Sequence, residues 1–129
     1  MENLKIEPSK DTPEISFDFK KNLLNIKGYS YPENASKFYD PVFSWLEDYM
    51  SQSGDDAITA NLEIICFNSS STKILMDFFD LLEEAFFEKG RDVIVNWIYD
   101  EENENALEAG EDFQEELEGI TFNLVEKAE

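Results

Sequence analysis

Segments with two different hydrophobic periods alternate along the chain. Apolar residues alternate with polar ones in five short stretches, residues 15–19, 24–26, 62–67, 93–99 and 120–124, and this is the pattern of β-strands. Apolar residues recur every three to four positions in residues 38–49 and 74–85, and with fewer apolar residues in 100–118. This spacing indicates helices. Strands separated by helices favour parallel neighbours with right-handed crossovers. We therefore expect one small α/β domain over residues 1–129, in which an N-terminal hairpin and then alternating helices and strands form a mixed sheet with helices packed on it.

The element boundaries follow from turn and cap residues. Lys20-Lys21-Asn22 separates the two halves of the hairpin. Residues 1–13 show no period and are predicted to be a loose leader. For the first helix either Asn34 or Asp40 could be the N-cap, and Pro41 favours Asp40 because Pro suits the first helical position.

Four consecutive hydroxyl residues, Ser69 to Thr72, stand between the strand that closes on Phe67 and the following helix. The first N–H groups of a helix lack internal partners, and the helix dipole favours negative charge there, so this junction can be capped or can hold a phosphate. The simplest interpretation is a Ser N-cap. However, a cap needs only one hydroxyl, and Lys73 is the only cation between Lys37 and Lys89. We therefore treat the junction as a candidate modification site.

Charge narrows the possible partners. The chain has 30 acidic and 10 basic residues, no His and a formal net charge of −20. A field of this sign repels phosphate backbones and anionic lipids, so we expect neither nucleic acid nor a membrane as a partner. No apolar run approaches the roughly 18 residues of a membrane span. The lone Cys66, on an apolar strand, is predicted to be a buried hydrophobe, and its isolation fits a cytoplasmic protein.

Catalytic and metal chemistry have little support. There is no His to act as a base, no Gly-rich phosphate loop and no nucleophile elbow, so we expect no enzyme and no cofactor. Four acids have the spacing of an EF-hand loop: Asp100, Glu102, Glu104 and Glu111. Asn105, however, stands where the sharp turn of such a loop requires Gly, and a strand precedes it. We expect no metal site.

Three blocks of the sequence carry a resemblance: SYPENAS at 30–36, FNSSSTKILMDFFDLLEEA at 67–85 and VNWIYDEENENALEAGEDF at 95–113. In order and spacing they resemble the bacterial SiaC family of regulatory phosphoproteins, over most of the chain from about Ile15 to Phe113. That family is similar in fold to the STAS domains of anti-sigma-factor antagonists.

The resemblance implies a non-enzymatic switch. A partner kinase would phosphorylate a hydroxyl at the strand-to-helix junction, and a PP2C-type phosphatase would remove the phosphate. The unphosphorylated form would bind a downstream effector such as a diguanylate cyclase, with cyclic-di-GMP signalling and biofilm behaviour as the output.

The same resemblance implies the site residues. The family's phosphoacceptor follows the Asn of an Asn-Thr-Ser-Ser motif, which corresponds to Ser69 here. This chain has Ser where that motif has Thr, and the next two serines are alternative acceptors. The candidate partner-binding residues rest on the residues themselves as well as on the resemblance. They lie in the junction with the adjoining face of helix 72–88, and in the aromatic turn after residue 30: Asn68, Ser70, Ser71, Lys73, Tyr31, Glu33 and Asn34.

A second hypothesis comes from charge alone. Residues 100–118 contain ten acids and no base, and such a run is most simply a solvated helix that could be interrupted near Gly110. The chain could then be a constitutive acidic module that docks on a basic partner through residues 100–118.

Overall fold

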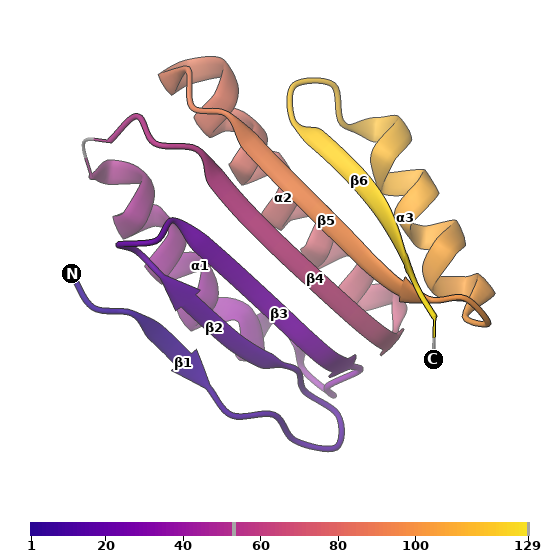
Figure 1. Cartoon of the computed structure of the whole chain (residues 1–129). Coiled ribbons are helices and arrows are strands. Elements are labelled where there is room, and N and C mark those ends of the chain that lie inside the picture. The colour runs from indigo at the N-terminus through magenta and orange to yellow at the C-terminus, as the bar shows by residue number, and fades with distance from the viewer. Residues whose placement is uncertain (53, 129) are drawn as a thin grey trace.

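Six strands form one sheet in the order in which they occur along the chain. The structure is a computed structural model and describes residues 1–52 and 54–128. Its elements are β1 (Leu4–Ile6), β2 (Glu14–Asp18), β3 (Leu23–Ser30), α1 (Ala35–Ser51), β4 (Ile58–Phe67), α2 (Ser69–Lys89), β5 (Val93–Asp100), α3 (Glu104–Glu116) and β6 (Thr121–Lys127). Figure 1 shows the sheet from its open face.

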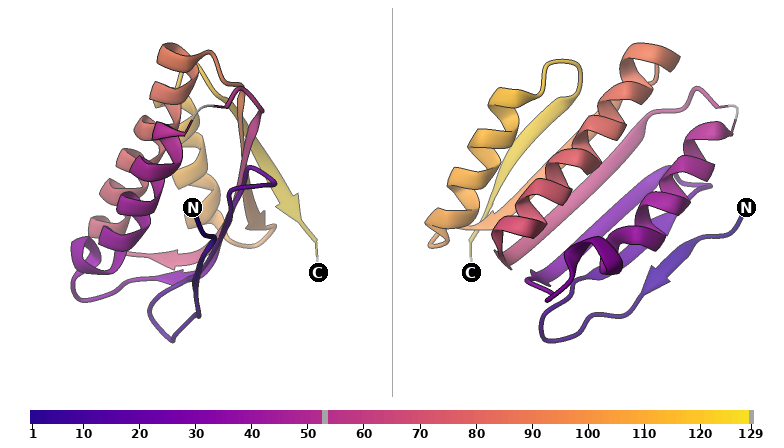
Figure 2. Two further views of the ribbon diagram at one scale, coloured as in Figure 1. Left: turned by 90° about the vertical axis from the view of Figure 1, so that its left-hand side faces the viewer. Right: turned by 180° about the vertical axis from the view of Figure 1, so that it is seen from behind.

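The helical crossovers between the parallel strands explain why the domain has one layer of helices and one sheet. The first three strands are antiparallel, and β3, β4, β5 and β6 are parallel. Each parallel pair is joined by one helix, and every crossover steps the same way across the sheet. Crossovers of one hand and one direction place all helices on the same face, as Figure 2 shows. The predicted mixed α/β sheet with an N-terminal hairpin is confirmed.

The core lies between this helical layer and the sheet. Aromatic rings from two helices and two strands meet there: the Phe79 ring centroid is 5.0 Å from that of Phe113 and 5.3 Å from that of Phe122, and Trp97 lies 5.4 Å from Phe113. Edge-on ring packing of this kind stabilises a core beyond simple burial. It fixes α2 and α3 on the strands beneath them.

The open face of the sheet carries a ladder of amides that sequence reasoning missed. Asn25, Asn61, Asn96 and Asn123 stand side by side on four parallel strands. The last three each donate from their side-chain Nδ2 to the Oδ1 of the preceding Asn, at 2.8 to 3.0 Å. Because adjacent Asn side chains are hydrogen-bonded to each other, the ladder keeps the centre of this face polar without adding charge.

A β-bulge corrects the prediction for Cys66. Gly28 pairs with Ile64 and Tyr29 pairs with Cys66, so Ile65 is an extra residue on β4. One inserted residue reverses which side chains face the core. Cys66 is therefore exposed rather than buried, and Phe67 turns inward instead, with its ring 6.3 Å from that of Trp97.

The predicted loose leader was also wrong. Residues Leu4–Ile6 form β1, which pairs with β2 in the register Leu4 to Phe17. The carbonyl of Glu2 accepts a hydrogen bond of 2.8 Å from the Trp45 indole. A strand of three residues is too short to show a period, so only its partner strand reveals it.

Two helix starts differ from the preferred prediction. The Asn34 side chain caps α1 by accepting from the Lys37 N–H at 3.1 Å, so Asn34 rather than Asp40 is the N-cap and Pro41 lies inside the helix. The next helix begins at Ser69 with Asn68 as its cap, not a Ser. In both cases a short amide reaches an unpaired helix N–H.

The acidic helix is not interrupted at Gly110. A Cβ at this position would lie 2.5 Å from Trp97 Cδ1 and 2.7 Å from Leu124 Cδ2. Glycine is thus required for close packing of α3 on β5 and β6, and the helix runs through it from Glu104 to Glu116.

Gly110→Ala should test this packing. The added methyl group has to displace Trp97 or Leu124, so we expect the free energy of unfolding to fall by about 1 to 3 kcal/mol. Glu111→Ala, an exposed position on the same helix, should change it by less than about 0.5 kcal/mol. Urea denaturation measures both values, and equal stability of the two variants would contradict the close approach.

Candidate functional site

The hydroxyl run lies at the carboxyl end of the central strand β4, where α2 begins. Asn68 accepts hydrogen bonds from two backbone amides of the first helical turn. Its Oδ1 accepts from the Ser71 N–H at 2.9 Å, and its carbonyl accepts from the Thr72 N–H at 3.0 Å. The N–H groups of Ser69 and Ser70 come before these in the turn and are the ones left for another acceptor. The positive end of the helix dipole is therefore presented at these two residues.

The three serines differ in exposure. Ser69 and Ser70 are exposed, whereas Ser71 is fully buried. Successive helical residues are about 100° apart around the axis, so Ser69 and Ser71 point to nearly opposite sides. A visiting enzyme can reach the first two hydroxyls, whereas the third is closed off by the domain itself.

Ser71 ends a buried chain of hydroxyl groups. The Ser30 hydroxyl donates to Ser71 Oγ at 2.8 Å, and Ser30 Oγ is 2.7 Å from the Tyr39 hydroxyl. Ser30 has one proton and gives it to Ser71, so Tyr39 is the donor to Ser30. Burial raises the pKa of Tyr39 to about 12, although the Ser30 contact lowers it in part. Tyr39 therefore keeps its proton at neutral pH, and the chain links α1, β3 and α2.

The loop after β3 lies against this junction, although some 35 residues of chain separate them. The Asn68 N–H donates to the Ser30 carbonyl at 3.2 Å, and the Asn68 side-chain amide donates to the Pro32 carbonyl at 3.4 Å. Tyr31, Glu33 and Asn34 are exposed beside it. Hence the structure brings together the two segments that sequence reasoning named separately.

Lys73 is exposed one helical turn after Ser69. Side chains four residues apart on a helix are neighbours. An ammonium group at this position can therefore meet a negative charge carried by Ser69. Tyr31 is held in place by a hydrogen bond of 2.9 Å from its hydroxyl to the Lys10 carbonyl.

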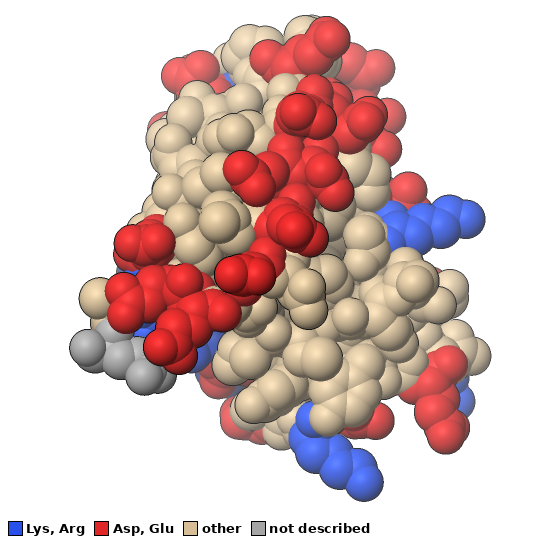
Figure 3. Space-filling model, turned by 90° about the vertical axis from the view of Figure 1, so that its right-hand side faces the viewer, with Lys and Arg blue, Asp and Glu red and all other residues tan. Residues whose placement is uncertain are grey.

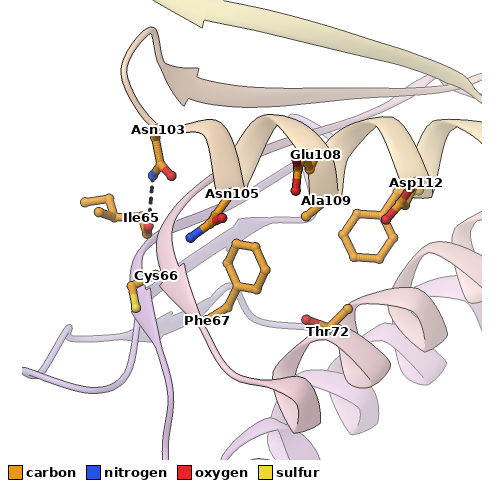
Figure 4. Close-up of a pocket in the computed structure, with 10 residues that line it drawn as sticks. Ile65, Cys66, Phe67, Thr72, Asn103, Asn105, Glu108, Ala109 and Asp112 are labelled. Carbon is orange, nitrogen blue, oxygen red and sulfur yellow. Dashed lines mark hydrogen bonds between the residues drawn. The ribbon is translucent and has the colours of Figure 1, made fainter.

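A groove beside the junction was not predicted. It has a volume of about 390 Å³ and lies between the start of α2 and one side of α3. Figure 4 shows Phe67 and Thr72 on one side and Glu108, Ala109 and Asp112 on the other. The sequence holds little signal for it, because the groove depends on the bulge that turns Phe67 and on the packing of α3.

Within residues 1–52 and 54–128, no three His, Cys, Asp or Glu side chains are grouped so that they could hold a metal ion. Asp100, the first residue of the EF-hand spacing, instead accepts a hydrogen bond of 2.9 Å from the Glu102 N–H. None of the helices in the same residues has the length and apolar character needed to cross a membrane.

Comparisons with known proteins agree on one group. A profile described as SiaC family regulatory phosphoprotein matches residues 6–127. An uncharacterized protein of Pseudomonas aeruginosa strain UCBPP-PA14 is 37% identical over 116 residues, 90% of each chain. The fold is similar to the solved structure of SiaC of P. aeruginosa, with a TM-score of 0.88, 33% identity and coverage of 98% of this chain and 100% of that one.

Another similar structure contains a partner. It is the crystal structure of the diguanylate cyclase SiaD in complex with its activator SiaC from P. aeruginosa. The TM-score is 0.84 and the identity 35%, and the match covers 98% of this chain and 99% of the matched one.

The buried hydroxyl chain can be tested separately from any modification. Ser71→Ala removes the acceptor of the Ser30 proton, so we expect the free energy of unfolding to fall by about 1 kcal/mol. Ser69→Ala removes an exposed hydroxyl and should change it by less than about 0.5 kcal/mol. Chemical denaturation of both variants gives the comparison. If Ser69→Ala destabilised the domain as much as Ser71→Ala, the assignment of a buried and an exposed side would be wrong.

Proposed function

The chain belongs to the SiaC family of regulatory phosphoproteins, and we propose that it is a cytoplasmic switch in which phosphorylation at Ser69 controls binding to a diguanylate cyclase. As a member of this family it is a regulator and not itself an enzyme. In the proposed cycle a partner kinase adds the phosphate and a PP2C-type phosphatase removes it. The unphosphorylated form binds the cyclase and activates cyclic-di-GMP synthesis.

One observation carries the choice of Ser69: it is the exposed first residue of α2, directly after the cap. A kinase needs a hydroxyl that it can enclose, and Ser71 offers none without opening of the domain. Ser70 is exposed as well. We prefer Ser69 because it has the family's position directly after Asn68.

The helix start suits a phosphate. A phosphoserine adds about −1.5 to −2 charges at neutral pH, and the dipole and the first amides of α2 stabilise such a charge. Lys73 stands one turn further on and can pair with it. The domain can therefore accept the modification without a change of fold.

A bound partner accommodates the phosphate less easily than the free domain does. Two like charges 4 Å apart at an effective dielectric of 20 repel by about 4 kcal/mol. A hundredfold loss of affinity requires only about 2.7 kcal/mol. A carboxylate or an apolar side chain of the cyclase over Ser69 is thus enough to release the complex upon phosphorylation.

A second candidate function keeps some support. Figure 3 shows acidic side chains gathered in a stripe along the side of the molecule formed by α3. This is the surface that a constitutive acidic module would use, with residues 100–118 docking on a basic partner. In that case changes at Ser69 would leave binding unaltered, whereas neutralising the stripe would abolish it.

The decisive variant is Ser69→Asp. We expect it to weaken binding to the cyclase that the wild-type chain activates by at least about thirtyfold, or about 2 kcal/mol, because a carboxylate then lies in the interface. Its melting temperature should match that of wild type, since Ser69 is exposed. Affinity is measured by calorimetry and activation by cyclic-di-GMP production. Wild-type affinity in Ser69→Asp would refute the switch.

The acceptor itself is identified by mass. Protein made in its native host without the phosphatase should gain one phosphate, about 80 Da, and Ser69→Ala should not. Ser70→Ala is the matched control, because its hydroxyl is equally exposed and adjacent. Phosphate retained in Ser69→Ala and absent from Ser70→Ala would move the acceptor to Ser70.

A further inference from the structure

An apolar side chain faces outward at the bulge in β4, next to the proposed switch. Ile65 is the inserted residue and is 44% exposed. The Asn103 side chain at the start of α3 donates to the Ile65 carbonyl at 2.9 Å, as drawn in Figure 4. Bulges often occur where a strand re-aims a side chain for function. Here the bulge is tied to the neighbouring helix, so Ile65 is held in a fixed position rather than on a free loop.

Ile65 lies at the rim of the groove between α2 and α3, and its side chain points away from the cavity in Figure 4. The floor of this groove is apolar and comes from Phe67, Ala109 and Phe113, whereas Glu108 and Asp112 line its helical wall. These two acids are four residues apart and therefore adjacent on α3. Neither of the two salt bridges formed within residues 1–52 and 54–128 uses them, and no Lys or Arg lines the groove.

The groove adjoins the proposed switch. Phe67 and Thr72 both line it, and Ser69 lies between them in the chain. A partner seated in the groove therefore reaches the exposed first turn of α2. Below the acidic stripe, the face of the molecule seen in Figure 3 is mostly uncharged.

From these observations we propose that the groove is the docking site of a cyclase segment that presents an apolar side chain next to a Lys or Arg. The apolar side chain enters the groove and packs on its floor, the segment continues over the rim onto Ile65, and the basic group pairs with Glu108 and Asp112. This inference rests on the proposed function and adds where and by what chemistry the partner is held.

The arrangement also explains how a negative phosphate can release a basic segment. The basic group is already neutralised by two carboxylates in a partly enclosed site, where ion pairs are less screened than at an open surface. The phosphate instead arrives at the end of the groove that the partner covers with uncharged surface. Lys73 and the first amides of α2 can hold the phosphate in the free domain, but an uncharged partner surface offers no replacement for the hydration that the phosphate loses in the complex, and this loss is unfavourable.

The test uses the unphosphorylated full chain and the cyclase that it activates. Ile65→Asp should weaken binding at least about thirtyfold, because it places a charge in the apolar contact. The matched control is Val125→Asp, which introduces the same charge at another exposed β-branched strand residue away from the groove, and it should bind within about twofold of wild type. Melting temperatures of both variants verify that the fold is kept.

The acidic wall is tested by neutralisation. Glu108→Gln with Asp112→Asn should weaken binding about tenfold and reduce its dependence on salt. Glu111→Gln with Glu115→Gln removes the same charge from exposed positions of α3 outside the groove and should retain both.

The outcomes separate the two proposals. If the groove variants bind like wild type, or if their controls lose as much affinity, the docking site is wrong while the switch stands. If the wild-type chain activates no diguanylate cyclase of its organism, the proposed function itself fails. If Ser69→Asp and the groove variants all lose binding while the controls retain it, both proposals are supported.

Discussion

The burial of Ser71 determines how the start of α2 is presented to solvent. Its hydroxyl accepts from Ser30, which in turn contacts Tyr39, so strand β3 and helix α1 hold this one turn from behind. A helical turn cannot bury all its sides against one layer. Fixing Ser71 inward therefore obliges Ser69 to point outward, and the same hydrogen bonds that anchor the domain expose the residue that we propose to be modified.

A second consequence of this anchoring concerns the neighbouring strand. The chain must leave β4 in a direction that delivers Ser71 to Ser30, and the bulge at Ile65 changes that direction just before the junction. The bulge inverts the inward and outward positions that follow, so the half-buried Phe67 packs against the core while Cys66 faces solvent as Ile65 does. The exposed apolar surface beside the switch is thus a by-product of how the helix is placed.

Much of the fold could be predicted because it depends on period. The alternation in residues 15–19 and 24–26, and the helical spacing in residues 74–85, survive in the structure as β2, β3 and α2. Predictions failed where a single contact overrode the pattern. Cys66 was misplaced because one inserted residue breaks the period, and Gly110 was read as a break because its close approach to Trp97 is tertiary.

The candidate site divides in the same way. Ser69 and Asn68 could be named from the junction and the family resemblance, and the loop at Tyr31 from its aromatic and turn residues. The contact of Asn68 with this loop, through Ser30 and Pro32, joins segments that are far apart in the sequence and has no local signature. The amide ladder that begins at Asn25 is equally invisible, because it requires the register of four strands. Registers and bulges are set by the assembled sheet, whereas periods are set by each segment.

The large net charge of the chain limits how a partner can detect the phosphate. The chain carries −20 before modification, and a phosphate changes this to about −22. Such a small fractional change barely alters the long-range field, which is screened within about 8 Å at physiological salt in any case. The signal must therefore be read at contact distance, by a partner that covers the first turn of α2. A strongly acidic protein that is switched through charge therefore needs its modified residue inside the interface, and Ser69, which we propose as that residue, is exposed and lies in the chain between Phe67 and Thr72 of the groove.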